Sequence, residues 1–135
     1  MRRILKAMAM AAAILGAGPV AAQEGPIEGA IQGQVDAFLA DDVGRAFGYA
    51  SPGVQRLFGT PERFGRMVRE GYPMVWRPSE VRYLESRDLG VGVLQRVLMR
   101  DAAGVPWVLE YQMVEGPEGW VIDGVRILQA PEVGA

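Results

Sequence analysis

Few residues in this sequence could do acid–base chemistry, because its 135 residues include no histidine and no cysteine. The commonest general base, thiol nucleophiles and the usual zinc ligands are therefore absent. What remains is a carboxylate with a raised pKa beside a tyrosine that donates to a developing oxyanion. On the predicted strands the candidate bases are Asp123 and Glu110, and the candidate donors are Tyr111 and Tyr83. Asp123 precedes a glycine, as turn residues do, and Glu110 alternates away from the aromatic face. The sequence therefore disfavours an enzyme.

A second set of side chains suits binding. Aromatic residues and methionine on one sheet face could line a cavity for a flat apolar ligand, or could fill the same space as core. Arginines beside them could hold a carboxylate through two parallel hydrogen bonds, or could pair with Glu80 or Glu85 on the surface. The candidate ligand-binding residues are Trp76, Arg77, Arg82, Tyr83, Trp107, Tyr111, Met113 and Trp120.

Metal and cofactor sites are not predicted. Asp41 and Asp42 are adjacent carboxylates, but hard cations take six or more oxygen ligands, so we interpret the pair as a helix cap. The methionines are not clustered as a copper site requires, and filling gaps in the core is the better interpretation.

The first 22 residues have the pattern of a secretory signal peptide. A basic head precedes an apolar run over residues 7–17 and small residues that end at Ala22. The run is shorter than the roughly 20 apolar residues of a membrane-spanning helix, which disfavours an uncleaved anchor. We therefore predict cleavage after Ala22, release into the periplasm and no membrane attachment afterwards.

The predicted mature chain is small and acidic. Residues 23–135 are enough for a single domain, for which we expect an ordered core over about residues 27–130. Without the leader, eleven basic residues face sixteen acidic ones. That balance argues against a nucleic acid or an anionic membrane as the partner.

The N-terminal half of the mature chain is predicted to be helical. Apolar residues at helical spacing begin at Ile27, with polar residues, among them Gln34, between them. Further helices are predicted to start at Asp42, at Ser51 and at Thr60, because a capping side chain precedes an apolar stripe at each. Pro52 and Pro61 suit the first position of the last two helices, and Gly71 and Pro73 the end of the fourth.

The C-terminal half is predicted to be a sheet. Branched and aromatic residues joined by short turns indicate four strands that pair antiparallel in chain order. A bulge at Asp123 and Gly124 would restore the phase of the last strand, and a short fifth strand is predicted at residues 74–76. The four longer strands are expected at residues 81–84, 91–100, 106–114 and 120–128.

Together these elements predict an α+β fold, in which N-terminal helices pack on a curved antiparallel sheet of four to five strands. The run FGYASPGVQRLFGTPERFGRMVREGYPMVWRP and the closing GWVIDGVRIL resemble an exported proteobacterial family, the domain of unknown function 4864. The order of elements is similar to the cone of nuclear-transport-factor-2-like proteins in the cystatin-like superfamily.

The resemblance implies no activity, since cone folds host isomerases, dehydratases, binding modules and dimer scaffolds. We expect a non-enzymatic exported module that binds a small apolar or carboxylate ligand, or a protein partner. One alternative is a structural homodimer through the exposed sheet face, where Leu94, Leu98, Val108 and Val114 would form an apolar patch. The other is a histidine-free isomerase or lyase.

Overall fold

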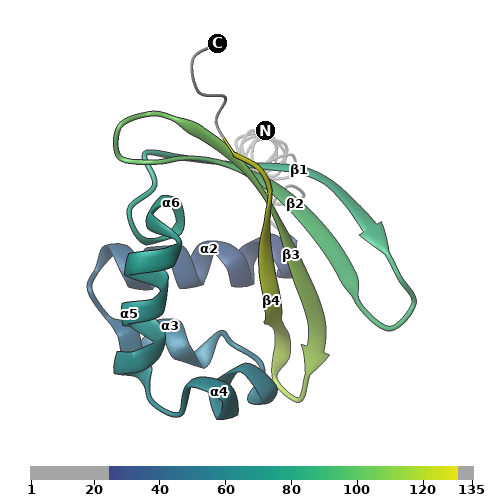
Figure 1. The fold of residues 1–135 in the computed structure, drawn as a ribbon. Helices are drawn as coiled ribbons and strands as arrows, with labels where there is room; N and C mark the ends of the chain where they lie inside the picture. Colours follow the sequence, from purple (N-terminus) through teal and green to yellow (C-terminus); the bar gives the residue numbers. More distant parts are fainter. Residues whose placement is uncertain (1–24, 131–135) are drawn as a thin grey trace, which may run out of the picture.

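The computed structural model describes residues 25–130 (Figure 1). The predicted signal peptide lies outside the described residues. Within them, no helix is long and apolar enough to cross a membrane.

Five helices make up the first half of the described chain. Asp42, Ser51 and Thr60 cap α3, α4 and α5 as predicted, each accepting the backbone N–H of the residue three positions later. Proline occupies the first turn of α4 and α5, where its missing N–H is not needed. The bounds are α2 Pro26–Leu39, α3 Val43–Gly48, α4 Pro52–Phe58, α5 Pro61–Gly71 and α6 Pro73–Trp76.

Four strands follow and form one open antiparallel sheet in the order β1-β2-β3-β4. The predicted meander is confirmed, and each strand overlaps its expected range. The strands run over Glu80–Asp88 (β1), Val93–Arg100 (β2), Pro106–Gly116 (β3) and Gly119–Gln129 (β4).

The prediction of a fifth strand at residues 74–76 is wrong, because this segment is part of the short helix α6. The backbone N–H groups of Val75 and Trp76 both donate to the carbonyl of Tyr72, which closes a helical turn. Pro73 at the first position favours that turn, since its fixed φ angle suits a helix. Aromatic and branched residues here serve packing rather than strand pairing.

The predicted bulge in the last strand is confirmed. Gln112 pairs with Gly124 and Met113 pairs with Ile122, so Asp123 has no partner on β3. Ile122 and Val125 consequently both pack toward the helices. Ile122 also forms a parallel bridge to Ala50, which anchors the link between α3 and α4 to β4.

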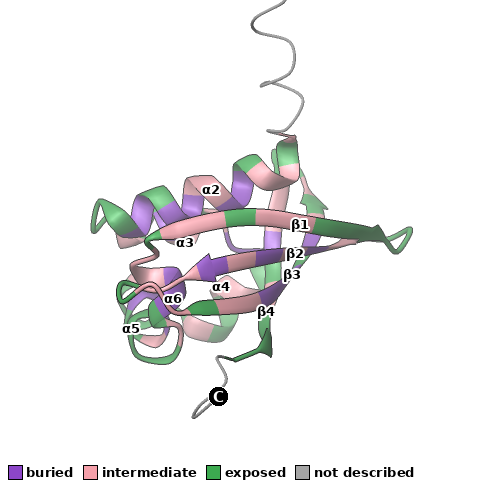
Figure 2. Ribbon diagram, turned by 90° about the horizontal axis from the view of Figure 1, so that it is seen from above, coloured by how far each residue is buried: buried purple, intermediate pink, exposed green. Residues whose placement is uncertain are grey.

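The core lies between the helices and one face of the curved sheet, as the α+β prediction requires. Figure 2 shows the buried residues along α2 and the middle of the strands, and exposed ones at the far end of the β1–β2 hairpin. α2 and α4 contact β4, and α6 contacts β2. The largest fully buried side chains are Tyr111, Phe38, Ile31, Met74, Met99, Leu109, Met113, Val35 and Val97.

Candidate functional site

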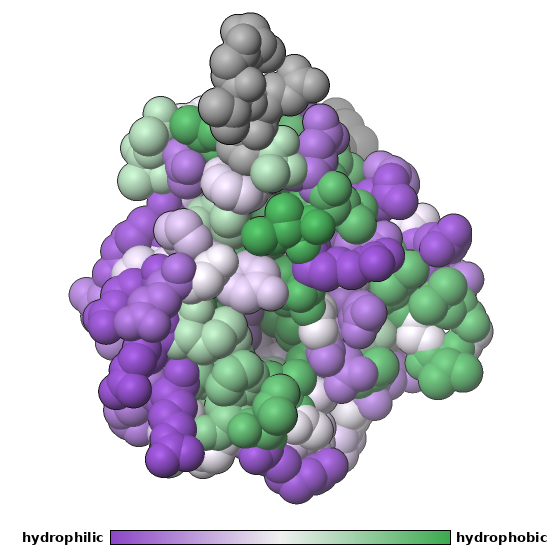
Figure 3. Space-filling model, viewed as in Figure 1, coloured by the Kyte–Doolittle hydropathy of each residue, from purple (hydrophilic) through white to green (hydrophobic). Residues whose placement is uncertain are grey.

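A cavity of about 250 Å³ lies between the helices α4 and α5 and the strand β4. In the space-filling view it appears as a hollow among hydrophobic residues (Figure 3). Most of its walls are apolar, and three residues, from α2, β4 and the α5–α6 junction, bring polar groups to it. It is lined by Gln34, Ala50, Val54, Leu57, Phe58, Phe64, Met67, Val68, Tyr72, Val75, Ile122, Asp123, Gly124 and Val125.

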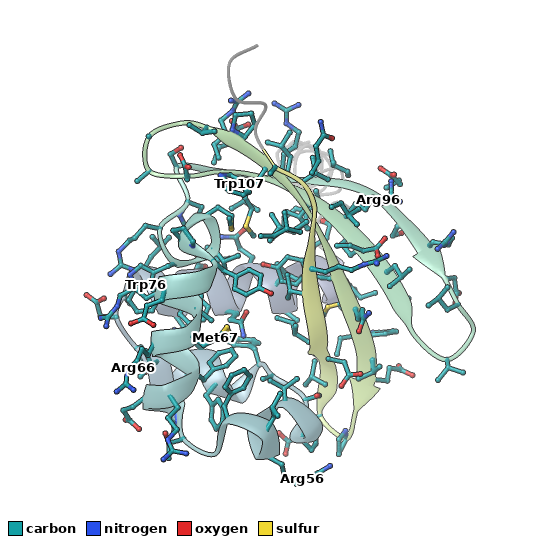
Figure 4. All side chains as sticks on the ribbon, in the orientation of Figure 1. Arg56, Arg66, Met67, Trp76, Arg96 and Trp107 are labelled. Carbon is teal, nitrogen blue, oxygen red and sulfur yellow. The ribbon has the colours of Figure 1, made fainter. Side chains whose placement is uncertain are left out.

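The helical walls come from the apolar stripes of α4 and α5. No residue of α4 is fully buried, and Val54, Phe58 and Met67 are only half-buried. Leu57 at the rim is 76% exposed. Met67 points from α5 into the space in front of β4 (Figure 4). These stripes therefore line open space that they do not fill.

Gln34 is a buried polar side chain at this cavity. It comes from α2, is only 3% exposed, and its amide Nε2 donates to the carbonyl oxygen of Ala46 at 3.1 Å. This bond orients the amide, because only the NH₂ end can donate to a carbonyl. Among residues 25–130 no group donates to Oε1. Every fully enclosed side-chain oxygen of the described chain has a hydrogen-bond partner. Because Oε1 of Gln34 has none, it must border open space, and Gln34 lines this cavity.

Asp123 reaches the cavity because of the bulge, which turns its side chain toward the start of α4. The hydroxyl of Ser51 donates to Asp123 Oδ1 at 2.7 Å and accepts the backbone N–H of Val54 at 3.3 Å. In the described chain Oδ2 receives no hydrogen bond. Tyr72 also lines the cavity, and its hydroxyl donates to the Val125 carbonyl at 3.4 Å, a long bond. The polar groups at the cavity are thus mainly acceptors.

Comparison with known proteins identifies the family. A family model for a domain of unknown function, DUF4864, matches residues 20–135. The chain belongs to the DUF4864 family. No curated protein and no solved structure matches it. The expected relation to nuclear-transport-factor-2-like proteins therefore stays a prediction.

In this DUF4864 chain the predicted ligand-binding residues lie outside the cavity. Tyr111 and Met113 are core residues, 0% and 1% exposed. Among the described residues, the Tyr111 hydroxyl donates to the sulfur of Met99 at 4.0 Å. Burial raises the pKa of Tyr111, with smaller contributions from Tyr83 and Tyr72. The sequence allowed Tyr111 and Met113 either to line a pocket or to fill the core. On the inner face of β3 they fill the core.

Trp76 and Arg77 close the C-terminal end of α2. The Arg77 guanidinium lies 4.6 Å from the Trp76 ring centroid, and the Trp76 ring packs on Phe38 with centroids 5.4 Å apart. Arg77 donates to the carbonyl of Phe38 at 2.7 Å and pairs with Asp41. A carbonyl in the last turn of a helix has no partner within the helix. Here the Phe38 carbonyl accepts from Arg77 and from the backbone N–H of Asp41, at 2.9 Å.

Arg82 and Tyr83 have partners within the chain. Arg82 pairs with Glu80 at 3.3 Å on the surface, which is one of the two alternatives given for it. The Tyr83 hydroxyl lies 2.9 Å from Gln32 Oε1 and 3.3 Å from the Glu28 carbonyl, so it connects β1 to α2.

The two remaining tryptophans lie at the ends of the sheet. The indole N–H of Trp107 donates to Asp101 at 3.1 Å, and this bond, with backbone N–H groups of the β2–β3 turn, lowers the pKa of Asp101. Trp120 borders a second, more polar cavity of about 350 Å³ between the start of α4 and the β3–β4 turn. None of the eight candidates lines the cavity at α4 and α5.

Glu110 lies on the outer face of β3, as alternation predicted, yet its side chain is only 3% exposed. Arg126 contacts it at 2.7 Å and Arg96 at 3.5 Å, and Arg96 also pairs with Glu85 at 3.1 Å. Hydrogen bonds from Arg126 lower the pKa of Glu110, burial opposes them, and Arg96 adds to the lowering. A general base needs the opposite shift toward neutrality, so this environment does not suit catalysis.

Sequence reasoning missed Gln34, which it assigned to the polar side of its helix. The available signal was spacing, because Gln34 lies three residues after Ile31 and four before Phe38, both fully buried. Leu39 shows the opposite error, being 46% exposed although it was assigned to the apolar stripe. No group of three or more acidic residues among residues 25–130 is arranged to hold a metal ion.

Proposed function

We propose that this DUF4864 domain is a non-enzymatic module that binds a small, largely apolar molecule between α4, α5 and β4. The observation that carries the proposal is the apolar cavity of about 250 Å³ beside a core whose largest side chains are fully buried. An engineered apolar cavity of about 150 Å³ is already large enough to bind benzene. The proposed setting is the periplasm, after removal of residues 1–22.

Packing energetics support an occupant. Phe58, Met67 and Val54 present carbon atoms to the cavity without protein partners on the far side, and such atoms forgo dispersion contacts. A ligand of matching size would supply those contacts. It could enter past Leu57, which is 76% exposed at the rim.

The placement of the acid–base candidates supports binding rather than catalysis. Tyr111 lies on the inner face of β3 and Glu110 on its outer face, so they cannot act on the same substrate. Asp123 does border the cavity, but Ser51 donates to one of its carboxylate oxygens.

Filling the cavity tests the proposal. Val54→Phe adds volume inside it and should abolish binding of 4-fluorotoluene, measured by ¹⁹F NMR line broadening. The variant should remain folded, since filling a cavity commonly adds about 0.5–2 kcal/mol of stability.

Leu39→Phe is the matched control, because it enlarges a half-exposed side chain of α2 that does not line the cavity. This control should bind the probe as the unmodified protein does. Equal binding by Val54→Phe and Leu39→Phe would contradict the proposal, as would no binding by the unmodified protein of either 4-fluorotoluene or its analogue with a hydroxyl, 4-fluorobenzyl alcohol.

A second candidate function, homodimerisation through the outer sheet face, is favoured by one observation. Glu85, Arg96, Glu110 and Arg126 form a row of alternating charge across the four strands. A second copy turned by a two-fold axis would set Glu85 against Arg126 and Arg96 against Glu110. The predicted patch of Leu94, Leu98, Val108 and Val114, all half-buried, flanks this row.

Val114→Glu, opposite Val121, would place an unpaired charge in that interface. Native mass spectrometry should then detect a dimer for the unmodified protein and a monomer for the variant, because burying an unpaired charge is costly. Leu39→Glu on α2 is the control and should stay dimeric. A monomer for the unmodified protein at high micromolar concentration would rule the dimer out.

A further inference from the structure

We infer that the ligand of the cavity carries a hydrogen-bond donor, such as a hydroxyl, an amide N–H or an ammonium group, on an apolar body, and that it is not a carboxylate. The inference rests on the proposed binding function. It narrows the ligand class that the sequence left open, since an apolar or a carboxylate ligand was expected there.

Gln34 brings a hydrogen-bond acceptor to the cavity. Gln34 lines the cavity and is 3% exposed, its amide is oriented by the bond to the Ala46 carbonyl, and its Oε1 is not fully enclosed and has no donor in the described chain. An acceptor that borders open space bonds to water, so the site selects a ligand that replaces this water with a donor. A ligand without one would displace water from Oε1 and leave the oxygen unpaired.

Asp123 brings a carboxylate to the edge of the same cavity. Asp123 is held by Ser51 through Oδ1, which leaves Oδ2 to accept from a ligand. The Tyr72 hydroxyl directs its proton toward the Val125 carbonyl, so its oxygen is a further acceptor. All three polar residues at the cavity can thus accept a donor.

A ligand carboxylate would need a positive counter-charge at the cavity. Among the described residues that line the cavity none is an arginine or lysine. Arg77, the arginine expected to hold a carboxylate, is instead engaged by Asp41 and the Phe38 carbonyl. A ligand carboxylate would therefore enter an apolar space beside Asp123 with no cation to pair with, which is strongly unfavourable.

Four probes that share one fluorinated ring separate these cases: 4-fluorobenzyl alcohol, 4-fluorobenzylamine, 4-fluorotoluene and 4-fluorobenzoate. Their affinities for the protein, which contains no cysteine, are measured by ¹⁹F NMR titration at pH 7. The alcohol or the amine should bind about 3- to 10-fold more tightly than 4-fluorotoluene, as one hydrogen bond implies, and the benzoate most weakly.

Two outcomes overturn the inference in different ways. If 4-fluorotoluene or the benzoate binds as tightly as both donors, the cavity binds ligands but the donor requirement is wrong. If none of the four probes binds, the proposed binding function fails together with the inference. The ranking is measured on the unmodified protein, so it stands even if a variant does not fold.

Variants then assign the acceptor. Gln34→Met keeps the length of the side chain but removes the amide, and should lower the affinity for the alcohol toward that for 4-fluorotoluene. Asp123→Asn keeps an acceptor for Ser51 but removes the charge, and should weaken the amine more than the alcohol. An unchanged preference for donors in both variants would show that neither residue selects the ligand and would overturn the inference.

Discussion

The space between helices and sheet has a filled end and an open end. At the filled end α2 and α6 cover the sheet, and Phe38, Met99 and Tyr111 are 0% exposed. At the open end α4 and α5 stand in front of β4, and a cavity of about 250 Å³ remains. Aromatic rings are present at both ends. The ring centroid of Phe64 lies 5.9 Å from that of Phe38 and 5.7 Å from that of Phe58.

The helices, rather than the sheet, cause the difference between the filled end and the open end. α2 has 14 residues and lies on the sheet, whereas α4 has 7 and α5 packs mainly on α3, α6 and α4. A parallel bridge at Ala50 and the bond from Ser51 to Asp123 anchor α4 at its start. A cavity therefore cannot be located from apolar and aromatic content. Its position depends on the distance at which the helices are held from the sheet.

The largest effect expected from this comparison concerns Tyr111. Tyr111→Ala should destabilise the fold by about 3–5 kcal/mol, because truncating a buried ring loses its transfer free energy and leaves a void. Chemical denaturation followed by circular dichroism measures the loss.

Met67→Ala is the matching substitution at the open end. Met67 already faces the cavity and is half-buried, so its truncation should cost less than about 2 kcal/mol, the low end for Met→Ala. A loss at Met67 as large as that at Tyr111 would mean that the open end is as tightly packed as the filled one.

Glu110 extends the comparison to the outer face of the same strand. Glu110→Gln removes the charge that Arg126 and Arg96 contact, and should cost about 1.5–3 kcal/mol at pH 7, as for hydrogen bonds to charged groups. The pKa of Glu110 is lowered in the folded state, chiefly by the hydrogen bonds from Arg126. Its stabilisation is therefore fully present above the ordinary value of 4.5 and is lost as the pH falls through the lower folded value.

The difference in unfolding free energy between Glu110→Gln and the unmodified protein should thus be constant from pH 7 to pH 5.5 and shrink below pH 4.5. Glu115→Gln on the same strand is the control, because Glu115 is exposed, and it should show a small difference. A gap for Glu110→Gln that persists unchanged at low pH would show that packing, not charge, stabilises this site.

Local features of the fold could be predicted because nearby residues determine them. Ser51 and Thr60 cap helices through bonds to the residue three positions on, and the phase change at Asp123 required a bulge. Residues 74–76 misled the prediction, since their strand-like composition is overridden by Pro73 and by packing on Phe38.

The candidate site could not be predicted in the same way, because a cavity depends on how far apart whole elements lie. The apolar faces of α4 and α5 were identified, but nothing in the local sequence indicates that the space beside them remains unfilled. Gln34 and Glu110 show a second limit. Each is polar in sequence and buried in the structure through partners, Ala46 for one and Arg126 for the other, that lie 12 and 16 residues away.

The smallest expected effect compares two tyrosine hydroxyls, one at each end. Tyr83→Phe removes the hydroxyl that ties β1 to α2, which donates to Gln32 Oε1 at 2.9 Å with the Glu28 carbonyl 3.3 Å away, and should cost about 0.5–1.5 kcal/mol. Tyr72→Phe removes one bond of 3.4 Å between the α5–α6 junction and β4 and should cost less than about 0.5 kcal/mol. Thermal denaturation of both variants gives the comparison. Tyr72→Phe should also keep its affinity for 4-fluorotoluene, because the ring that borders the cavity remains. Equal costs for the two would mean that the open end is closed as firmly as the filled end, and a ligand would then have to displace structure rather than enter a space already present.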